Sequence, residues 1–162
     1  MIRPALPPDL PAVRDIWNPV IRDTAITFNR IEKTTDDLLQ MLQGKAAAGH
    51  AFLVVETQGT VAGFATYGQF RTGVGYARAM EHTIILASHA HGKGLGRALM
   101  EALARHASAA GARCLIAGIS GESPQSRAFH RHIGFADVAT IRQVGWKFGR
   151  FMDLHLMQKM LP

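Results

Sequence analysis

The sequence predicts one α+β domain in three layers, α/β/α, with a mixed β-sheet between helices. Two observations lead to this prediction. The chain has 162 residues, of which 48% are apolar and 19% charged, and this is enough to enclose one hydrophobic core. Strand-like and helix-like segments follow one another in the order β-α-α-β-β-β-α-β-α-β-β, without a linker or an internal repeat. Such an order favours a mixed sheet with helices packed on its faces.

The N-terminal third predicts a short strand and two helices. The strand is expected at Ile2–Ala5, and Asp9 is the expected cap of the first helix. The apolar face of this helix consists of Leu10, Val13, Trp17 and Val20. Pro19 is expected to bend or end the helix, because proline removes a backbone donor. A second helix is expected between Thr34 and Gly49.

The rest of the chain predicts six strands and two helices. The strands are expected at Phe52–Glu56, Thr60–Tyr67, Met80–Ala87, Cys114–Ile119, Phe135–Val144 and Arg150–Met160. Gln58-Gly59 closes the first two strands into a hairpin. One helix ends at Gly111 and buries Leu95, Leu99 and Leu103. Ser123-Pro124 is a good cap and first residue for the other helix, which runs through Arg131.

Composition excludes several classes of protein. Cys114 is the only cysteine, so neither an intrachain disulfide nor a Cys-rich zinc site is possible. The first residues lack the pattern of a signal peptide, and no stretch approaches the roughly 20 apolar residues of a membrane span. We therefore expect a cytoplasmic protein. The 16 glycines and the net charge of +6 allow a phosphate-bearing ligand or nucleic acid.

Three glycines, Gly92, Gly94 and Gly96, are expected where a strand turns into a helix. Without side chains there, backbone N–H groups can point at one spot beside the positive end of the helix, which suits a pyrophosphate. Lys93 and Arg97 add charge. The P-loop pattern fails because Gly94 follows Lys93, and the dinucleotide-binding pattern of three glycines fails as well. A turn that only connects strand and helix is the alternative.

The segment Met80–Met100 resembles the acetyl-coenzyme A signature of the GNAT N-acetyltransferases, in which Arg/Gln-x-x-Gly-x-Gly/Ala lies between a strand and a helix. His91 replaces the Arg or Gln of that pattern. The resemblance implies one GNAT domain over residues 1–162, a mostly antiparallel sheet and acetyl-CoA as cosubstrate. The coenzyme-binding positions that it implies are Ile84, Ile85, Leu86, Gly92, Lys93, Gly94, Leu95, Gly96, Arg97, Ser123 and Ser126.

Further motifs resemble the phosphinothricin and methionine sulfoximine N-acetyltransferase subgroup. They are Asn18, Thr24–Phe28, Tyr67–Arg71, Glu81-His82, Ala117–Ser120, Phe129-His130 and Val144–Asp153. Enzymes of this subgroup acetylate the α-amino group of small amino-acid analogues and are typically homodimers. The resemblance therefore implies a small-molecule amine as acceptor and a homodimer.

Amide formation from a thioester needs a neutral amine, and a free α-amino group with a pKa near 8 is mostly protonated at neutral pH. Glu81 is the expected base, with a surface glutamate as the alternative. His82 is expected on the opposite face of the strand, as a supporting residue. His130 is the expected donor to the departing thiolate, and a packing or coenzyme-contacting histidine is the alternative.

The expected acceptor contacts include Arg71, whose guanidinium can hold a carboxylate or phosphinate. Phe28, Tyr76 and Trp146 are candidate pocket walls, although each residue type is more often part of a core or an interface. Two basic residues are expected to line either the site or a dimer interface; these are Lys147 and Arg150.

Other functions stay open from the residues alone. They are acetylation of a protein N-terminus, a polyamine or an aminoglycoside, binding of coenzyme A without catalysis, and binding of nucleic acid. The 18 Lys and Arg are dispersed and no RNA-binding motif is present, so nucleic acid is not the expected partner. His89/His91 and His130/His132 have no accompanying carboxylate or Cys pattern, so no metal is expected.

Overall fold

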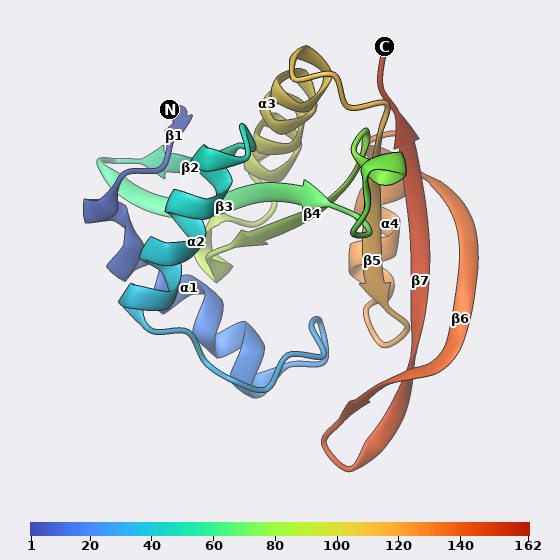
Figure 1. Ribbon diagram of the computed structural model, residues 1–162. Helices are drawn as coiled ribbons and strands as arrows, with labels where there is room; N and C mark the ends of the chain where they lie inside the picture. The colour runs from blue at the N-terminus through green and yellow to red at the C-terminus, as the bar shows by residue number, and fades with distance from the viewer.

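A seven-stranded sheet lies between two layers of helices (Figure 1). The structure is a computed structural model and describes residues 1–162. The strands are β1 (Ile2–Pro4), β2 (Phe52–Thr57), β3 (Thr60–Gln69), β4 (Ala79–Leu86), β5 (Cys114–Ser120), β6 (Ala136–Lys147) and β7 (Arg150–Met160). The helices are α1 (Leu10–Asp23), α2 (Thr35–Ala47), α3 (Leu95–Ala109) and α4 (Pro124–His132). Short 3-10 turns lie at Pro7–Asp9, Val74–Tyr76 and Ser88–Ala90.

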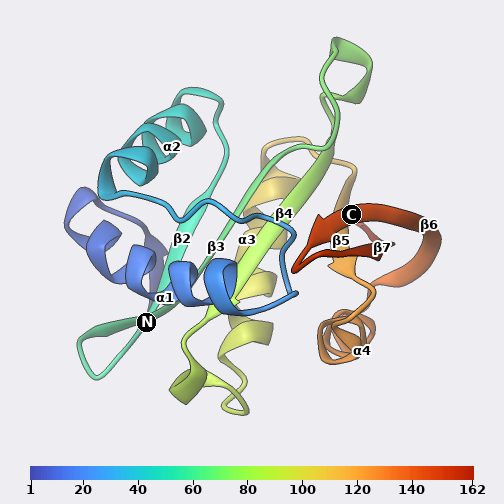
Figure 2. The ribbon, with the colours of Figure 1, turned by 90° about the horizontal axis from the view of Figure 1, so that it is seen from below.

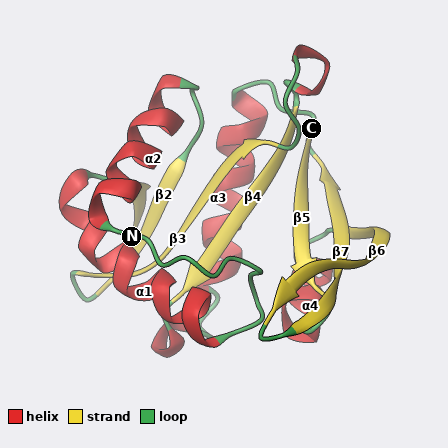
Figure 3. Cartoon of the chain, turned by 60° about the horizontal axis from the view of Figure 1, so that its bottom comes forward, coloured by secondary structure: helices red, strands yellow, loops and turns green.

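The sheet has the strand order β1-β2-β3-β4-β5-β7-β6, and only the pair β4–β5 is parallel. The expected three-layer fold with a mixed, mostly antiparallel sheet is therefore confirmed. β4 and β5 pair only from Ala79 to Glu81, opposite Cys114 to Ile116. Beyond Glu81 the two strands diverge, which divides the sheet into the two arms visible in Figures 1 and 3.

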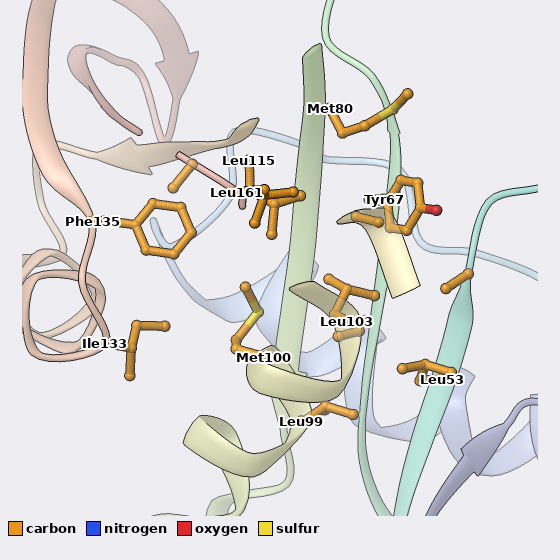
Figure 4. Packing of buried hydrophobic residues seen from close by; sticks show 14 of the residues in the cluster. Leu53, Tyr67, Met80, Leu99, Met100, Leu103, Leu115, Ile133, Phe135 and Leu161 are labelled. Carbon is orange, nitrogen blue, oxygen red and sulfur yellow. The ribbon is translucent and has the colours of Figure 1, made fainter. Parts of the chain in front are cut away.

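Each face of the sheet has its own hydrophobic core. α1 and α2 cover one face of β2–β4, and α3 lies on the opposite face (Figure 2). Alternation along β2 supplies both cores, because Phe52 and Val54 pack toward α1 while Leu53 and Val55 pack toward α3. Figure 4 shows the second core, in which α3 places Leu99, Met100 and Leu103 against the strands. Because both faces of the sheet are packed against helices, the two strands that diverge, β4 and β5, are held in position.

Helix α1 differs from the prediction in three ways. Asp9 does not cap it: the carboxylate pairs with Arg3 and accepts the backbone N–H of Leu6. Pro19 does not end it, because the helix continues to Asp23. Ile21, rather than Val20, completes the buried face. Ile21 lies four residues after Trp17, on the same face of the helix, and its burial offsets part of the roughly 3 kcal/mol that an internal proline costs.

The remaining elements agree with the sequence to within a few residues. The predicted start of α2 is confirmed, because Thr34 and Asp37 accept each other's backbone N–H groups at 3.1 and 2.8 Å. Gln58 and Gly59 close the β2–β3 hairpin with φ of 52° and 75°. β6 extends to Lys147, three residues beyond the expected end. None of the four helices combines the length and the apolar character needed to cross a membrane.

Candidate active site

A cavity of about 380 Å³ opens where β4 and β5 diverge. It is lined by Trp17, Ile26, Thr27, Phe28, Asn29, Glu81, His82, Thr83, Ile84, Ile85, Ala117, Gly118, Ile119, Ser120, Ser126, His130 and Leu154. The peptide groups that β4 directs toward β5 beyond Glu81 have no β5 partner. The divergence therefore creates both the space and a row of free main-chain donors and acceptors along its wall.

Glu81 is the last residue of β4 that pairs with β5, and its side chain faces the cavity. The surrounding walls desolvate the carboxyl group and raise its pKa. Gly118 of β5 leaves room for it, since a Cβ at that position would lie 3.1 Å from Glu81 Oε1. A carboxylate that faces an open cavity, with its pKa raised by partial burial, is placed to accept a proton from a molecule bound there.

His82 and His130 form a buried pair on the other side of β4. Their Nε2 atoms are 2.9 Å apart, and His130 Nδ1 lies 2.7 Å from the carbonyl oxygen of Ser126. Because that carbonyl only accepts, His130 Nδ1 carries the hydrogen, and in the neutral pair His82 Nε2–H donates to His130 Nε2. Burial lowers the pKa of His130, and burial together with His130 lowers the pKa of His82 to about 3. Both rings are therefore neutral at pH 7.

The glycine turn lies at the far end of β4, outside the cavity. Gly92 and Gly94 have φ of 73° and 74°, a left-handed conformation that favours glycine. Gly96 serves a different purpose, because a Cβ there would meet the Phe129 ring at 3.2 Å. Lys93 is exposed beside the turn, and no side chain caps the N–H groups at the start of α3. This arrangement can hold a phosphate group.

Two predicted residues beside the turn have partners of their own. Arg97 Nη2 lies 2.6 Å from His132 Nε2. His91, which departs from the signature, places Nε2 3.3 Å from the Leu86 carbonyl oxygen. The His91 ring therefore contacts the end of β4.

Of the predicted site residues, six line the cavity together: Phe28, Glu81, Ile84, Ile85, Ser126 and His130. Ser123 does not reach it. Ser123 is the residue before α4, as expected, but its hydroxyl does not cap the helix and instead donates to Ser126 Oγ at 2.7 Å. Arg127, the residue after Ser126, pairs with Asp137 at 2.8 Å.

Arg71 and Tyr76 lie outside the cavity. They belong to the exposed loop between β3 and β4, which projects from the top of the molecule in Figure 3. The Arg71 guanidinium lies over the Tyr76 ring, 5.5 Å from its centroid. Trp146 is also absent from the cavity wall and packs against Phe151 on the β6–β7 hairpin.

The other lining residues, which the sequence did not assign to the site, come from several parts of the chain. Trp17 belongs to α1, and Ile26, Thr27 and Asn29 follow it. Thr83 belongs to β4, Ala117–Ser120 to β5 and Leu154 to β7. The motifs Thr24–Phe28 and Ala117–Ser120 can be recognised in the sequence. That both segments line the same cavity depends on the path of the strands and could not be inferred from spacing. No group of three or more His, Cys, Asp or Glu side chains is arranged to hold a metal ion.

Sequence comparison identifies relatives over nearly the whole chain. Residues 12–135 match the model of the Acetyltransferase (GNAT) family. The L-methionine sulfoximine/L-methionine sulfone acetyltransferase of Salmonella typhimurium is 35% identical over 153 residues, which cover 94% of this chain and 90% of that protein. The glycine turn and the cavity both fall largely within the matched region.

Two solved structures have the same fold. The ribosomal-protein-alanine N-acetyltransferase from Brucella melitensis is 38% identical, with a TM-score of 0.96 over 99% of both chains. The phosphinothricin acetyltransferase from Sinorhizobium meliloti, solved in complex with AcCoA, is 30% identical, with a TM-score of 0.94 over 99% of this chain and 88% of that one.

Proposed function

Because the chain belongs to the GNAT family of acetyltransferases, we propose that it transfers an acetyl group from acetyl-CoA to the α-amino group of a small amino acid or amino-acid analogue. Relatives named for phosphinothricin and for methionine sulfoximine support this acceptor class. The observation that carries the proposal is the desolvated carboxyl of Glu81 beside the opening between β4 and β5.

Acetyl-CoA is proposed to bind along the opened edge of β4, with its pyrophosphate at the turn of Gly92, Lys93 and Gly94. The N–H groups at the start of α3, from Leu95 on, have no side-chain cap, and this and the positive φ of the glycines suit the role. Ile84, Ile85 and Leu86 would contact the pantetheine arm through their main chain, and Ser126 through its hydroxyl. A main-chain N–H aimed at the thioester oxygen is worth about 3 kcal/mol in the transition state.

Glu81 is the proposed base. It removes the proton of the substrate ammonium, directly or through water, and the free amine attacks the thioester carbon. A C–N bond forms, the C–S bond breaks, and the electron pair of that bond leaves with the thiolate of coenzyme A. The nitrogen then loses its second proton to the thiolate or to water, which leaves a neutral amide. The raised pKa of Glu81 supports this role, because a base works best when its pKa is close to the operating pH.

His130 is the proposed donor to the departing thiolate. In the neutral pair its Nδ1–H is bound to Ser126 O and its Nε2 accepts from His82. One of these bonds must give way before a ring N–H of His130 can hydrogen-bond to the thiolate sulfur. Because the ring is neutral, it would stabilise the thiolate through this bond without giving up its proton. Alkyl thiolates are also fair leaving groups, so we expect replacement of His130 to slow the reaction less than replacement of Glu81.

The acceptor is proposed to lie against Phe28, with Arg71 and Tyr76 as further contacts. Phe28 lines the cavity, whereas Arg71 lies in the exposed loop of the single chain. An acceptor contact from Arg71 therefore requires a site that a second copy of the chain shares. We propose a homodimer for this reason and because the β6–β7 hairpin exposes Val138, Ile141, Val144, Trp146, Phe148 and Phe151, each between 42% and 62% exposed.

The test is release of free thiol from acetyl-CoA in the presence of single amines. We expect turnover with methionine sulfoximine, phosphinothricin or methionine sulfone. A peptide with N-terminal alanine belongs in the same panel, because the structure from Brucella melitensis is described as a ribosomal-protein-alanine acetyltransferase. Turnover of the peptide alone would assign a protein acceptor, and background release with every amino-acid analogue would overturn the proposed acceptor class.

A further inference from the structure

The tip of the β6–β7 hairpin lies against the segment that follows α1. Figures 2 and 3 show the two close together, although more than 100 residues separate them in the sequence. The segment is part of the cavity wall, through Ile26–Asn29. It follows α1, which packs on the same face of the sheet as Ile85, and alternation along β4 places Glu81 on that face too. The hairpin therefore supports the wall on the Glu81 side of the cavity.

A bulge in β6 bends the hairpin so that its tip lies against the segment that follows α1. Ile141 pairs with Leu154 and Gly145 pairs with Met152, so three residues of β6 lie opposite one residue of β7. Gln143, in the bulge, has φ of 56°, and its N–H donates to Asp153 Oδ1 at 2.9 Å. Bulges bend a strand pair and increase its twist. Beyond the bulge the two strands pair again, Trp146 with Phe151 and Lys147 with Arg150, and form the terminal unit of the hairpin.

Lys147 connects this unit to the cavity wall. Its side chain is buried, with 2% of the residue exposed, whereas its neighbours Trp146 and Phe148 are about half exposed. Nζ donates to the carbonyl oxygens of Ile21 at 2.6 Å and Thr27 at 2.8 Å. Burial disfavours the charged ammonium group and lowers the pKa of Lys147. The hydrogen bonds to the two carbonyl oxygens compensate for this loss of hydration. Lys147 thus neither lines the cavity nor lies at the exposed hairpin surface.

Gly145 makes a second contact between the hairpin and the wall. A Cβ at this position would lie 2.6 Å from two atoms of the Phe28 ring. Only glycine lets the ring lie directly on the β6 main chain. Phe28 follows Thr27, so adjacent residues of the cavity wall are held by Gly145 and Lys147 through different interactions.

We propose that Lys147 is a positioning residue for the acceptor amine: by holding the Thr27 carbonyl it fixes the Phe28 wall of the acceptor site at the distance from Glu81 that the acceptor needs. This proposal rests on the proposed acetyltransferase function. The coenzyme is bound by β4 and the glycine turn, which Lys147 does not contact. Loss of the contact is therefore expected to weaken use of the acceptor and to leave use of acetyl-CoA unchanged.

The experiment compares Lys147→Met with Lys45→Met. Methionine fills the space without a donor, and Lys45 is a matched control because its half-buried Nζ donates to the Tyr67 carbonyl oxygen at 2.8 Å, on α2 and away from the cavity. For Lys147→Met we expect the KM of the acceptor to rise about tenfold, with the KM of acetyl-CoA within about twofold of the wild type. Lys45→Met should leave both KM values unchanged.

Gly145→Ala perturbs the same wall without removing a hydrogen bond, and it covers the case in which Lys147→Met does not fold. Like Lys147→Met, it should raise the KM of the acceptor and leave the KM of acetyl-CoA unchanged. Gly44→Ala is the control, since a Cβ at Gly44 meets nothing within 4 Å. Equal effects on both KM values, or an unchanged acceptor KM in both hairpin variants, would overturn the proposal.

Hydrogen exchange separates this proposal from the proposed function. Lys147→Met should speed exchange of the amides of residues 24–34 and not those of β4, whether or not any amine is acetylated. Unchanged exchange in residues 24–34 would refute the contact as a restraint. Faster exchange in an enzyme that acetylates none of the amines would refute only the proposed function.

Discussion

Adjacent residues of β4 have opposite environments. Both line the cavity, but Glu81 is exposed to it, whereas His82 is buried against His130. Desolvation disfavours the charged form of each, so it raises the pKa of the acid and lowers the pKa of the base. The same physical effect therefore makes the Glu81 carboxylate a stronger base than a free glutamate and keeps His82 neutral. Strand alternation, which places neighbouring side chains on opposite faces, makes this separation possible.

Glu81→Gln tests the proposed base. At pH 6–7 we expect kcat to fall by about 10²- to 10⁴-fold, the usual range for loss of a general base. The deficit should shrink above pH 8, where the α-amine of the substrate is already neutral. In the wild type the rate should decline as the pH falls through the raised pKa of Glu81, because protonation removes the base.

The measurement is the pH–rate profile of thiol release, with Glu101→Gln as control, since Glu101 is exposed on α3 and does not line the cavity. A Glu81→Gln profile parallel to that of the wild type would remove Glu81 from the chemistry.

His82→Gln tests the buried histidine pair through stability. Unfolded His82 has the ordinary pKa of 6.5 and folded His82 a pKa of about 3. Between these values the unfolded chain binds the proton more strongly, so stability is lost as the pH falls from 6.5 toward 3, at up to about 1.4 kcal/mol per pH unit. His82→Gln should reduce this dependence in urea unfolding at pH 7, 6, 5 and 4. His89→Gln, at an exposed position, should not. If the unfolding free energy of wild type and His82→Gln changed equally with pH, the lowered pKa of His82 would be contradicted.

At the scale of elements, the site depends on where β4 stops pairing and on the turn at its end. β4 loses its β5 partner after Glu81, continues to Leu86 and is followed by the glycine turn at the start of α3. The strand, the turn and the helix are consecutive in sequence. Local signals were therefore enough to locate the expected phosphate site, whereas the cavity required β5 and the segment after α1.

Gly94→Ala and Gly111→Ala form a matched pair at the two ends of α3. Both glycines have positive φ, 74° and 87°, and a Cβ on either meets nothing within 4 Å. Each substitution should cost roughly 1–2 kcal/mol of stability from backbone strain alone. Only Gly94→Ala should also weaken the binding of coenzyme A. Titration calorimetry with coenzyme A and thermal unfolding together provide the measurement, and equal coenzyme affinity in the two variants would exclude the turn from the coenzyme site.

For the whole molecule, the β6–β7 hairpin combines two roles. Its buried side holds Lys147 against the segment after α1, and its outer side exposes Trp146, Phe148 and Phe151. If a second copy covers the exposed side, as we propose, dimer formation restrains the same hairpin that fixes the acceptor wall. β6 is also an edge strand of the sheet, and β1 is the other.

Phe151→Lys tests the dimer. We expect the wild type to have twice the 17.6 kDa mass of the chain by light scattering, and Phe151→Lys to shift this toward the single-chain mass. Leu6→Lys is the control, because Leu6 is 54% exposed and follows β1 at the opposite edge of the sheet. A wild type with single-chain mass at all concentrations would contradict the dimer.

Periodicity and turn residues determined most of the elements and the local part of the site. The strand before the glycine turn, the glycines themselves and the hairpin at Gln58-Gly59 are set by neighbouring residues, so their pattern is visible in the sequence. Glu81 could be chosen as the candidate base because it stands near the start of the strand that leads to this turn. The continuation of α1 through Pro19 could not be predicted, because it depends on burial of Ile21 in the tertiary core.

Only the tertiary structure decided which distant residues share the cavity. The contact of His82 with His130, the placement of Phe28 on Gly145 and the burial of Lys147 each join segments tens of residues or more apart. No local pattern encodes them, since they depend on where β4 and β5 separate and on the bulge that bends β6. The sequence by itself determined the chemical groups and the family, and long-range packing decided their distances, their burial and hence their protonation.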